Sequence, residues 1–223
     1  MSPLYNITPF TLLDFPDCTA CILWFAGCNM RCQYCYNPEI VLGKGNFGYD
    51  RALNFLKKRR GLLDGVVLSG GECTLHKGLE DFAADVKLMG YRLKIDTNGS
   101  RPKVLKRLVD QSLVDYVALD LKAMPKHFKT ITNSNLFKEF EQSLELLLHA
   151  GIGFEVRTTV HSSLIDREHL EQMGQYLQDA GYRGNFYVQH FVNGSQTLRP
   201  LPYSGKIDIA RLNLPGVNLI FRG

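Results

Sequence analysis

Residues 65–72 read GVVLSGGE, a short run of β-branched and apolar residues that ends in glycines and a carboxylate. Strands of a parallel sheet are nearly continuous in apolar residues when helices cover both faces. Residues 116–122, YVALDLK, repeat this pattern and end in an aspartate and a lysine. The two segments therefore predict buried parallel strands that carry polar residues at their carboxyl ends.

Outward from these segments, strand-like runs alternate with helix-like patterns along the chain. The other predicted strands are Ala20–Phe25, Arg92–Asp96, Phe154–Thr159 and Phe186–His190. The predicted helices are Asp50–Lys58, Lys77–Met89, Pro102–Gln111, Leu136–His149 and Asp166–Ala180. This alternation is typical of a parallel α/β sheet. The 223 residues are fewer than the roughly 250 of a closed eightfold barrel, so six strands fit either an open doubly wound sheet or an incomplete barrel.

The composition predicts a folded protein, because 45% of the residues are hydrophobic and 22% are charged. The net charge of +4 is too mild to indicate a nucleic-acid-binding protein. The sequence has no apolar run near the roughly 18 residues of a membrane span, and residues 1–14 lack the pattern of a secretion signal. We expect a cytoplasmic protein that binds neither nucleic acid nor membrane.

The six cysteines are unevenly distributed, since five of them lie in residues 18–35 and the sixth is Cys73. In a reducing compartment a local group of thiols favours metal binding or redox chemistry over disulfides. The segment 28–35, CNMRCQYC, holds three cysteines, whereas a structural zinc site wants four ligands. Thiolates are the usual ligands of iron–sulfur clusters, so this loop favours a cluster with one open iron. Cys18 and Cys21 are expected in the core.

Polar residues follow almost every predicted strand. They are Ser69–Glu72, Asp96–Gly99, Asp120–Lys122, Arg157–Thr159 and His190. The carboxyl ends of parallel strands carry the ligands of α/β folds. We therefore expect these residues and the cysteine loop to form one site.

The cysteine segment resembles the C-x3-C-x2-C signature of the radical S-adenosylmethionine (SAM) enzymes, including the aromatic Tyr34 before the last cysteine. SGGE at Ser69–Glu72 is similar to the Gly-Gly-Glu motif of that family, and DTNG and DLK are similar to motifs of glycyl-radical activating enzymes. The resemblance covers residues 14–191. It implies a partial (β/α)6 TIM-like barrel of parallel strands, open at one side, in a single domain over residues 1–223. Residues 1–17 would be an N-terminal extension, 18–191 the barrel core and 192–223 a C-terminal wrap.

The same resemblance implies a [4Fe-4S] cluster held by Cys28, Cys32 and Cys35. Its open iron would bind SAM, and reduction would release a 5′-deoxyadenosyl radical. Glu72 would bind the cofactor ammonium group, Lys122 its carboxylate, and glycines would let the backbone approach closely. The full set of expected SAM contacts is Tyr34, Ser69, Gly70, Gly71, Glu72, Asn98, Lys122, Arg157 and His190.

Three further features, formed by five residues, have more than one interpretation. Asp96, Thr97 and Asp120 resemble a monovalent-cation site of a similar activating enzyme, whereas the alternative has Asp96 capping a turn and Asp120 paired with Lys122. Arg157 would contact the cofactor carboxylate or pair with Glu155 or Asp120. Cys73 stands where the Gly-Gly-Glu motif usually ends in proline, and is either a functional or a structural thiol.

The segments TPFTLLDFPD (residues 8–17), DTNGS and RTTVH resemble activating proteins of anaerobic ribonucleoside-triphosphate reductase, which are akin to pyruvate formate-lyase activase. The implied function is abstraction of a glycine Cα hydrogen from a glycyl-radical enzyme, either that reductase or a formate-lyase-like enzyme. A reduced flavodoxin or ferredoxin would donate the electron. The alternatives are a radical SAM enzyme acting on a small molecule, such as a deazapurine synthase, and a non-enzymatic iron–sulfur or zinc protein.

Overall fold

The computed structural model describes residues 2–207 and 216–222, so residues 208–215 and 223 of the predicted C-terminal wrap lie outside the described residues. The chain forms two compact units. The first comprises Met1–Asn29, Glu39–Thr97 and Arg101–Ala118, and the second comprises Met30–Pro38, Asn98–Ser100 and Leu119–Gly223. Among the described residues, no helix combines the length and the apolar character that a membrane crossing requires.

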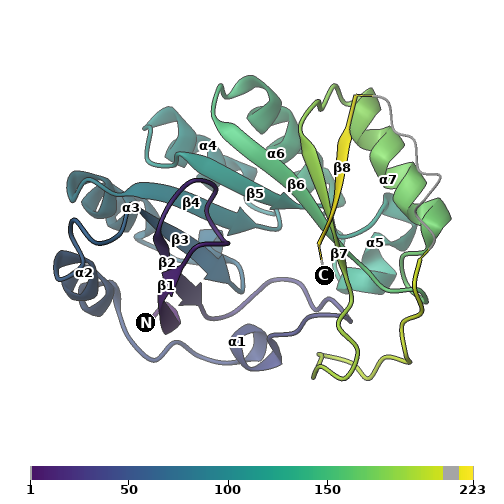
Figure 1. Ribbon diagram of the computed structural model, residues 1–223, viewed down its shortest axis with the longest axis horizontal. Helices are drawn as coiled ribbons and strands as arrows, with labels where there is room; N and C mark the ends of the chain where they lie inside the picture. Colours follow the sequence, from purple (N-terminus) through teal and green to yellow (C-terminus); the bar gives the residue numbers. More distant parts are fainter. Residues whose placement is uncertain (1, 208–215, 223) are drawn as a thin grey trace. The chain divides into compact units, whose positions relative to one another are not determined.

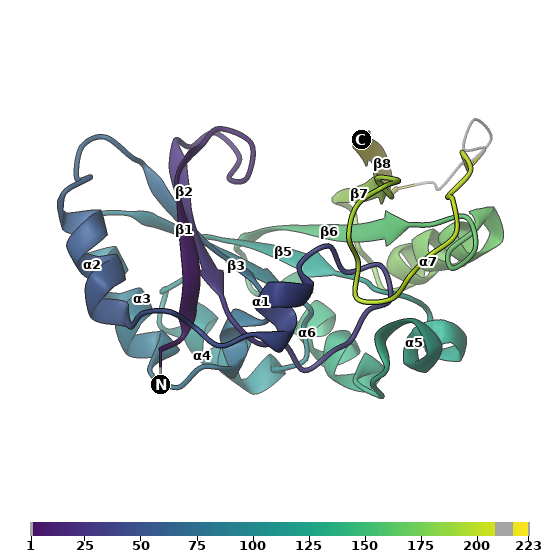
Figure 2. The ribbon, with the colours of Figure 1, turned by 90° about the horizontal axis from the view of Figure 1, so that it is seen from below.

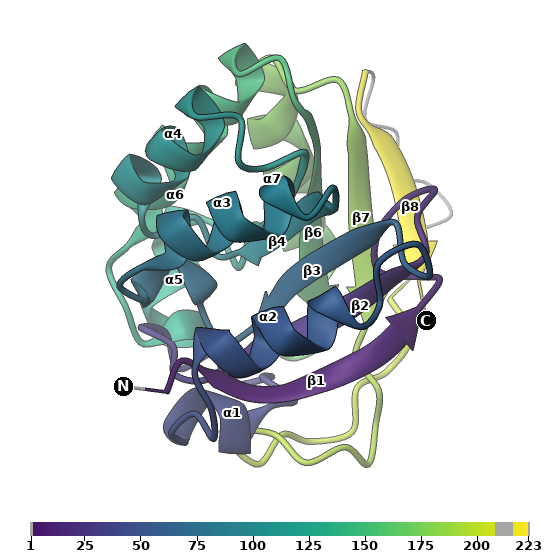
Figure 3. The ribbon, with the colours of Figure 1, turned by 90° about the vertical axis from the view of Figure 1, so that its left-hand side faces the viewer.

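The first unit is built on strands β1 (Leu4–Thr11), β2 (Ala20–Phe25), β3 (Gly65–Gly70) and β4 (Arg92–Thr97), together with the start of β5 (Tyr116–Asp120). β2, β3 and β4 pair in parallel, and β1 runs antiparallel to β2 at the edge. Figure 3 shows β1 alongside β2, with α2 (Tyr49–Lys57) and α3 (Leu79–Leu88) beside β3. The remaining elements are α1 (Pro38–Leu42), α4 (Pro102–Asp110) and the 3-10 turn η1 (Cys73–Leu75).

Apolar burial explains these elements. Val66, Val67 and Leu68 of β3 are fully buried, as expected for a strand covered on both faces. α4 begins at Pro102, whose fixed φ suits a first turn, and it buries Leu105 and Leu108 on one face.

The second unit contains the end of β5, then β6 (Gly153–Val160), β7 (Asn185–His190) and β8 (Asn218–Arg222). β6, β7 and β8 pair in parallel, and Figure 1 shows β7 and β8 side by side. The N–H of Leu121 donates to the carbonyl of Arg157 at 2.9 Å, which joins the end of β5 to β6. The helices are α5 (Pro125–Thr132), α6 (Phe137–His149) and α7 (Arg167–Asp179), and α5 and α7 are also visible in Figure 2.

The strands follow one another in chain order from β1 to β8, and β5 is divided between the two units. The sheet is mostly parallel and not closed, so the predicted open α/β architecture of the partial-barrel type is confirmed.

Two strands lie in segments that were expected to have other roles. β1 lies in the predicted N-terminal extension and covers the edge of β2, while β8 lies in the predicted wrap and extends the sheet beyond β7. Both add backbone hydrogen bonds to strands that would otherwise present an unpaired edge.

Candidate functional site

The cysteine loop leaves β2 after Phe25 and reaches α1 at Pro38. Cys28 belongs to the first unit, and Cys32 and Cys35 belong to the second. In the second unit the N–H of Cys35 donates to the carbonyl of Cys32 at 3.1 Å, so a tight turn separates the last two cysteines. The loop also bonds α5, because Arg31 N–H donates to the carbonyl of Thr132 at 2.7 Å. This part of the loop is therefore fixed by main-chain bonds.

The donor set of the loop fits an iron–sulfur cluster. Cys28, Cys32 and Cys35 form no disulfide, and cysteine thiolates are the usual cluster ligands. Among the described residues, no group of three or more His, Cys, Asp or Glu side chains is gathered closely enough to hold a metal ion. The assignment of the three thiols to one cluster therefore rests on their spacing in the sequence and stays a prediction.

Tyr34 ties the cysteine loop to the end of β5. Its side chain is buried, and its hydroxyl donates to the carbonyl of Lys122 at 3.3 Å. Burial raises the pKa of the Tyr34 phenol, which keeps it protonated as a donor. The contact of Tyr34 with adenine stays a prediction.

Gly70 and Gly71 have a role inside the first unit. Gly70 has φ of +110°, a conformation that L side chains rarely adopt. A Cβ at Gly71 would lie 1.9 Å from the carbonyl oxygen of Gly27. The N–H of Gly71 donates to Phe25, and that of Glu72 donates to Gly27, at 2.8 and 2.9 Å. The glycines let the end of β3 lie against the start of the cysteine loop, whereas the sequence suggested only approach to a cofactor.

Glu72 is fully buried and organises the turn that follows β3. Its Oε1 accepts a bond from the N–H of Thr74 at 3.1 Å and one from the hydroxyl of Thr97 at 2.9 Å. The hydroxyl of Thr74 donates to the same oxygen. Glu72 therefore caps η1 and links it to the end of β4. Its expected bond to the cofactor ammonium group stays a prediction.

Asp96 at the end of β4 belongs to a second polar group in the first unit. Its Oδ2 accepts from the Ser69 hydroxyl at 2.8 Å, and its Oδ1 lies 2.9 Å from the Lys94 ammonium nitrogen. The side chains of Lys94 and Asp96 are 3% and 11% exposed. The following turn is capped by Asn98, in the second unit, whose Oδ1 accepts from the N–H of Ser100 at 2.9 Å.

In the second unit Asp120 pairs with two cations. Its Oδ2 lies 3.0 Å from the Lys122 nitrogen, and its Oδ1 accepts from Arg157 Nε at 3.0 Å. Burial acts to lower the pKa of Lys122, but the adjacent carboxylate of Asp120 raises it above the usual value, so Lys122 is charged. The structure thus contains the Asp120–Lys122 pair, which was the alternative to the cation site, and the Arg157–Asp120 pair, which was one of the alternatives for Arg157. The monovalent-cation site formed by Asp96, Thr97 and Asp120 stays a prediction.

His190 ends β7, as predicted, and its ring stacks on Phe221 of β8 with 5.8 Å between centroids. It is half-buried. β8 therefore supports a residue that the sequence assigned to the cofactor.

The other three cysteines are buried. Cys18 and Cys21 are buried, which confirms their predicted place in the core. Cys73 is 1% exposed, and burial raises the pKa of its thiol well above the usual value. Thiolate character is what makes a cysteine reactive, so the structure favours the structural interpretation of Cys73.

Sequence reasoning missed the segment that bonds the cysteine loop from the C-terminal side. We call residues 191–205 the strap. The N–H of Leu198 donates to the carbonyl of Cys35 at 3.1 Å, and the N–H of Val192 donates to the Tyr36 hydroxyl at 2.6 Å. Main-chain bonds between distant segments leave no pattern in a sequence. The aromatic Tyr36 beside the last cysteine is the one signal that could have drawn attention to this contact.

Comparisons with known proteins show which family this chain resembles. The family model described as "Radical SAM superfamily" matches residues 22–180. A protein of Methanocaldococcus jannaschii named as a glycyl-radical enzyme activating enzyme is 29% identical over 78% of this chain and 75% of its own length. The pyruvate formate-lyase-activating enzyme of Clostridium pasteurianum is 26% identical over 80% of this chain and 77% of its own.

Among solved structures, that of Streptococcus suis SuiB bound to S-adenosylmethionine superposes with a TM-score of 0.68 and 14% identity. The match covers 91% of this chain and 52% of SuiB, so this chain spans about half the length of that protein. At this identity the likeness concerns the fold. Together the comparisons confirm the resemblance predicted from the cysteine segment and the strand ends.

Proposed function

Because the chain belongs to the radical SAM superfamily, whose members use a [4Fe-4S] cluster and S-adenosylmethionine, we propose that it activates a glycyl-radical enzyme. The observation that carries this proposal is the C-x3-C-x2-C loop after β2, in a chain similar over three quarters of its length to activating enzymes. The proposed partner is anaerobic ribonucleoside-triphosphate reductase, and a formate-lyase-like enzyme is the alternative.

The proposed roles follow from charge and position. The thiolates of Cys28, Cys32 and Cys35 hold the cluster. When bound, the cluster and S-adenosylmethionine supply a 5′-deoxyadenosyl radical. Lys122, charged at neutral pH, attracts the carboxylate of the cofactor, and Asp120 orients it.

Other residues bind the rest of the cofactor. Glu72 accepts from the ammonium group, and Tyr34 and His190 lie against the adenosyl part. A hydrogen atom leaves the partner glycine, so the chain needs no general acid or base and acts by positioning.

The proposed reaction also requires a reducing compartment and an electron donor. The proposed location is the cytoplasm, because a reducing compartment keeps the cysteines of such a loop as thiols that can bind a cluster. The cluster needs an electron before each activation, and a reduced flavodoxin or ferredoxin is the proposed donor.

The experiment is anaerobic reconstitution with iron and sulfide, followed by incubation with S-adenosylmethionine, dithionite and the purified reductase. We expect 5′-deoxyadenosine and the electron paramagnetic resonance signal of a glycyl radical on the reductase. Cys32→Ala should lose the visible iron–thiolate absorbance and both products. Cys18→Ala removes a thiol from the core and serves as the matched control that retains them.

The outcomes separate the alternatives. Failure of the wild-type protein to form 5′-deoxyadenosine would exclude radical SAM activity for this protein. Formation of 5′-deoxyadenosine without a glycyl radical on either the reductase or a formate-lyase-like enzyme would favour a small-molecule substrate.

A further inference from the structure

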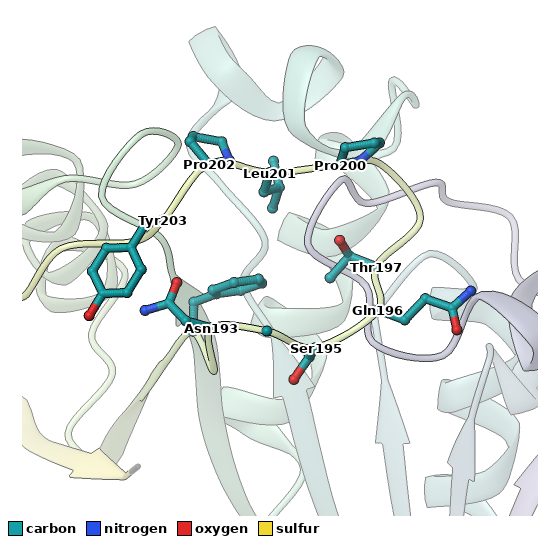
Figure 4. A pocket seen from close by; sticks show the side chains of 10 residues that line it. Asn193, Ser195, Gln196, Thr197, Pro200, Leu201, Pro202 and Tyr203 are labelled. Carbon is teal, nitrogen blue, oxygen red and sulfur yellow. The ribbon is translucent and has the colours of Figure 1, made fainter.

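A hollow in the strap and a buried ion pair of the first unit have no role in the proposed reaction. The hollow, shown in Figure 4, is lined by residues between 191 and 203, and none of the ten described lining residues is an acid, a lysine or an arginine. Its Asn193 side chain already bonds Ser204, and its Thr197 hydroxyl already donates to Arg199. The hollow therefore offers no charge to a ligand, whereas the ion pair holds two opposite charges in the protein interior.

The cation of this pair is Lys94 of β4, which is buried and reaches two oxygen atoms. Its ammonium group donates to the carbonyl oxygen of Asp14 at 2.6 Å and lies 2.9 Å from Oδ1 of Asp96. Lys94 and Asp96 are two residues apart on one strand, so their side chains project from the same face of the sheet. A lysine is almost never fully buried without a partner of opposite charge, and Asp96 supplies that charge.

The anion of the pair, Asp96, is held at both oxygens. Its Oδ2 accepts from the hydroxyl of Ser69 at 2.8 Å, while its Oδ1 faces the ammonium group of Lys94. A carboxylate that is largely buried needs a positive charge close by, because its own charge is costly to remove from water. Lys94 therefore fixes the charge of Asp96, and Asp96 in turn orients Ser69, one of the expected contacts of S-adenosylmethionine.

This arrangement does not fit the monovalent cation that the sequence suggested at Asp96, Thr97 and Asp120. In the first unit Lys94 already neutralises Asp96, and the hydroxyl of Thr97 donates to Glu72 at 2.9 Å. A metal ion bound to the same carboxylate would meet the ammonium group of Lys94 at short range, where like charges repel strongly.

The second unit gives the same result by itself. Both oxygens of Asp120 face cations of the protein, Lys122 at 3.0 Å and Arg157 at 3.0 Å. Each of the two carboxylates expected to bind a metal ion therefore has a positively charged side chain from its own unit.

We infer that Lys94 supplies the positive charge at Asp96 in place of a monovalent metal ion, so that the protein folds and binds its cofactor without one. An ammonium group carries the same charge as a potassium ion, and the two oxygens that it contacts are hard ligands of the kind that such ions accept. Lys94 is a positioning residue, because it acts through Asp96. The statement about the cofactor rests on the proposed function, whereas the statement about folding does not.

The test removes the ammonium group with Lys94→Met, which keeps an apolar side chain of nearly the same length. Urea denaturation of the full chain is compared in potassium chloride and in choline chloride at equal ionic strength, since choline is too large for the vacated space. We expect wild type to be equally stable in both salts. In Lys94→Met, potassium should raise the folding equilibrium constant about elevenfold, for a Kd of about 10 mM and about 0.1 M ion.

Two controls show whether the effect belongs to this carboxylate. Lys87→Met removes the cation of another pair in the first unit, since Lys87 lies 2.6 Å from Asp115, but that pair is in contact with water. Its stability should be the same in both salts. Lys94→Met combined with Asp96→Asn removes the carboxylate as well and should abolish the potassium effect.

A second measurement uses the reconstituted protein. KM for S-adenosylmethionine, measured from the formation of 5′-deoxyadenosine, should be the same for wild type in both salts. In Lys94→Met we expect KM to be at least threefold higher in choline than in potassium, because Asp96 orients Ser69 only when its charge is balanced. A residue that served packing alone would not make KM depend on the identity of the cation.

Greater stability or a lower KM of wild type in potassium than in choline would overturn the inference, since the wild-type protein would then bind the ion. Folded Lys94→Met with equal stability in both salts would overturn it as well. If Lys94→Met unfolds in both salts, the wild-type comparison decides, and equal stability and equal KM in the two salts support the inference. Absence of 5′-deoxyadenosine with wild type would overturn the proposed function and leave the stability comparison valid.

Discussion

The polar strand ends of the two units are built differently. In the first unit Glu72 is fully buried and bonds Thr74 and Thr97, and the backbone at Gly71 lies against Gly27. In the second unit the side chains of Asp120, Lys122 and Arg157 are 21–24% exposed and form ion pairs. Similar motif residues therefore serve the structure of the first unit and remain accessible in the second.

This difference predicts that substitutions in the two units affect different properties, folding stability in one and cofactor binding in the other. A buried acceptor with several donors costs much free energy to remove. Removing one of the two cations that pair with Asp120 costs less, because the other cation remains as its partner. Substitutions at the strand ends of the first unit should therefore affect folding before they affect the cofactor. Substitutions in the second unit should do the reverse.

The largest effect is expected for Gly71→Ala. Its Cβ would lie 1.9 Å from the Gly27 oxygen, and both groups are main chain, so neither can move aside without shifting the strand end. The free energy of unfolding should fall by about 3 kcal/mol, at the upper part of the range for overpacking. Urea denaturation of the apoprotein measures this change.

Gly48→Ala is the control for that experiment. Nothing lies within 4 Å of a Cβ at Gly48, and its φ of −87° suits any residue. We expect a change below about 0.5 kcal/mol. Equal effects of the two substitutions would contradict the close backbone contact.

Glu72→Ala should have the next largest effect. It removes the acceptor of the Thr74 N–H and of the Thr97 hydroxyl, which are both buried. The expected loss is about 2 kcal/mol in the free energy of unfolding, measured by urea denaturation. Glu72→Gln keeps a carbonyl oxygen as acceptor and should lose less. A stability equal to wild type in Glu72→Ala would show that the carboxylate serves the cofactor alone.

Much of the fold follows from the sequence alone because its strands are buried on both faces. The predicted bounds of Ala20–Phe25 are those of β2, and five of its six residues are buried. β1 was missed because it is an edge strand, in which polar residues and Pro9 interrupt the apolar pattern. Its existence depends on pairing with β2, which the local sequence does not encode.

The sequence predicted which residues belong to the candidate site, but not their contacts. The motifs located Glu72 and Lys122 at strand ends, but not what each one touches. The contact between Gly71 and Gly27 joins main-chain atoms of distant segments, so no side-chain pattern indicates it. The sequence left Arg157 with the cofactor carboxylate, Glu155 or Asp120 as partner. The structure pairs it with Asp120 from within β6, three residues before the strand ends, and residue types alone do not fix that contact.

In the second unit, Lys122→Met tests accessibility to the cofactor. It removes one of the two cations of Asp120 and leaves Arg157 in place. We expect KM for S-adenosylmethionine to rise about tenfold, the loss of one charge-assisted bond. The free energy of unfolding should fall less than in Glu72→Ala, because Arg157 still pairs with Asp120.

Lys106→Met is the matched control, because it makes the same substitution at another lysine that pairs with an aspartate. Lys106 pairs with Asp110 at 2.7 Å within α4, and both side chains are exposed. It should leave KM unchanged. A larger loss of stability in Lys122→Met than in Glu72→Ala would reverse the contrast between the two units.

The smallest expected effect is a pH dependence of stability that arises from His76 in the first unit. His76 is half-buried, its ring lies 5.3 Å from that of Phe25, and its Nε2 bonds the carbonyl of Ala26 at 2.8 Å. Burial lowers the pKa of His76, and the carbonyl offsets this only in part. The unfolded chain therefore binds a proton more readily than the folded chain.

The contribution of neutral His76 to stability is complete above the unfolded pKa of about 6.5 and declines as the pH falls below it. Its slope is at most about 1.4 kcal/mol per pH unit. His76→Gln keeps a donor for Ala26 but does not titrate, so urea denaturation from pH 7.5 to 5.5 should show a flatter profile than wild type. Identical profiles would place the acid sensitivity elsewhere and remove this distinction between the units.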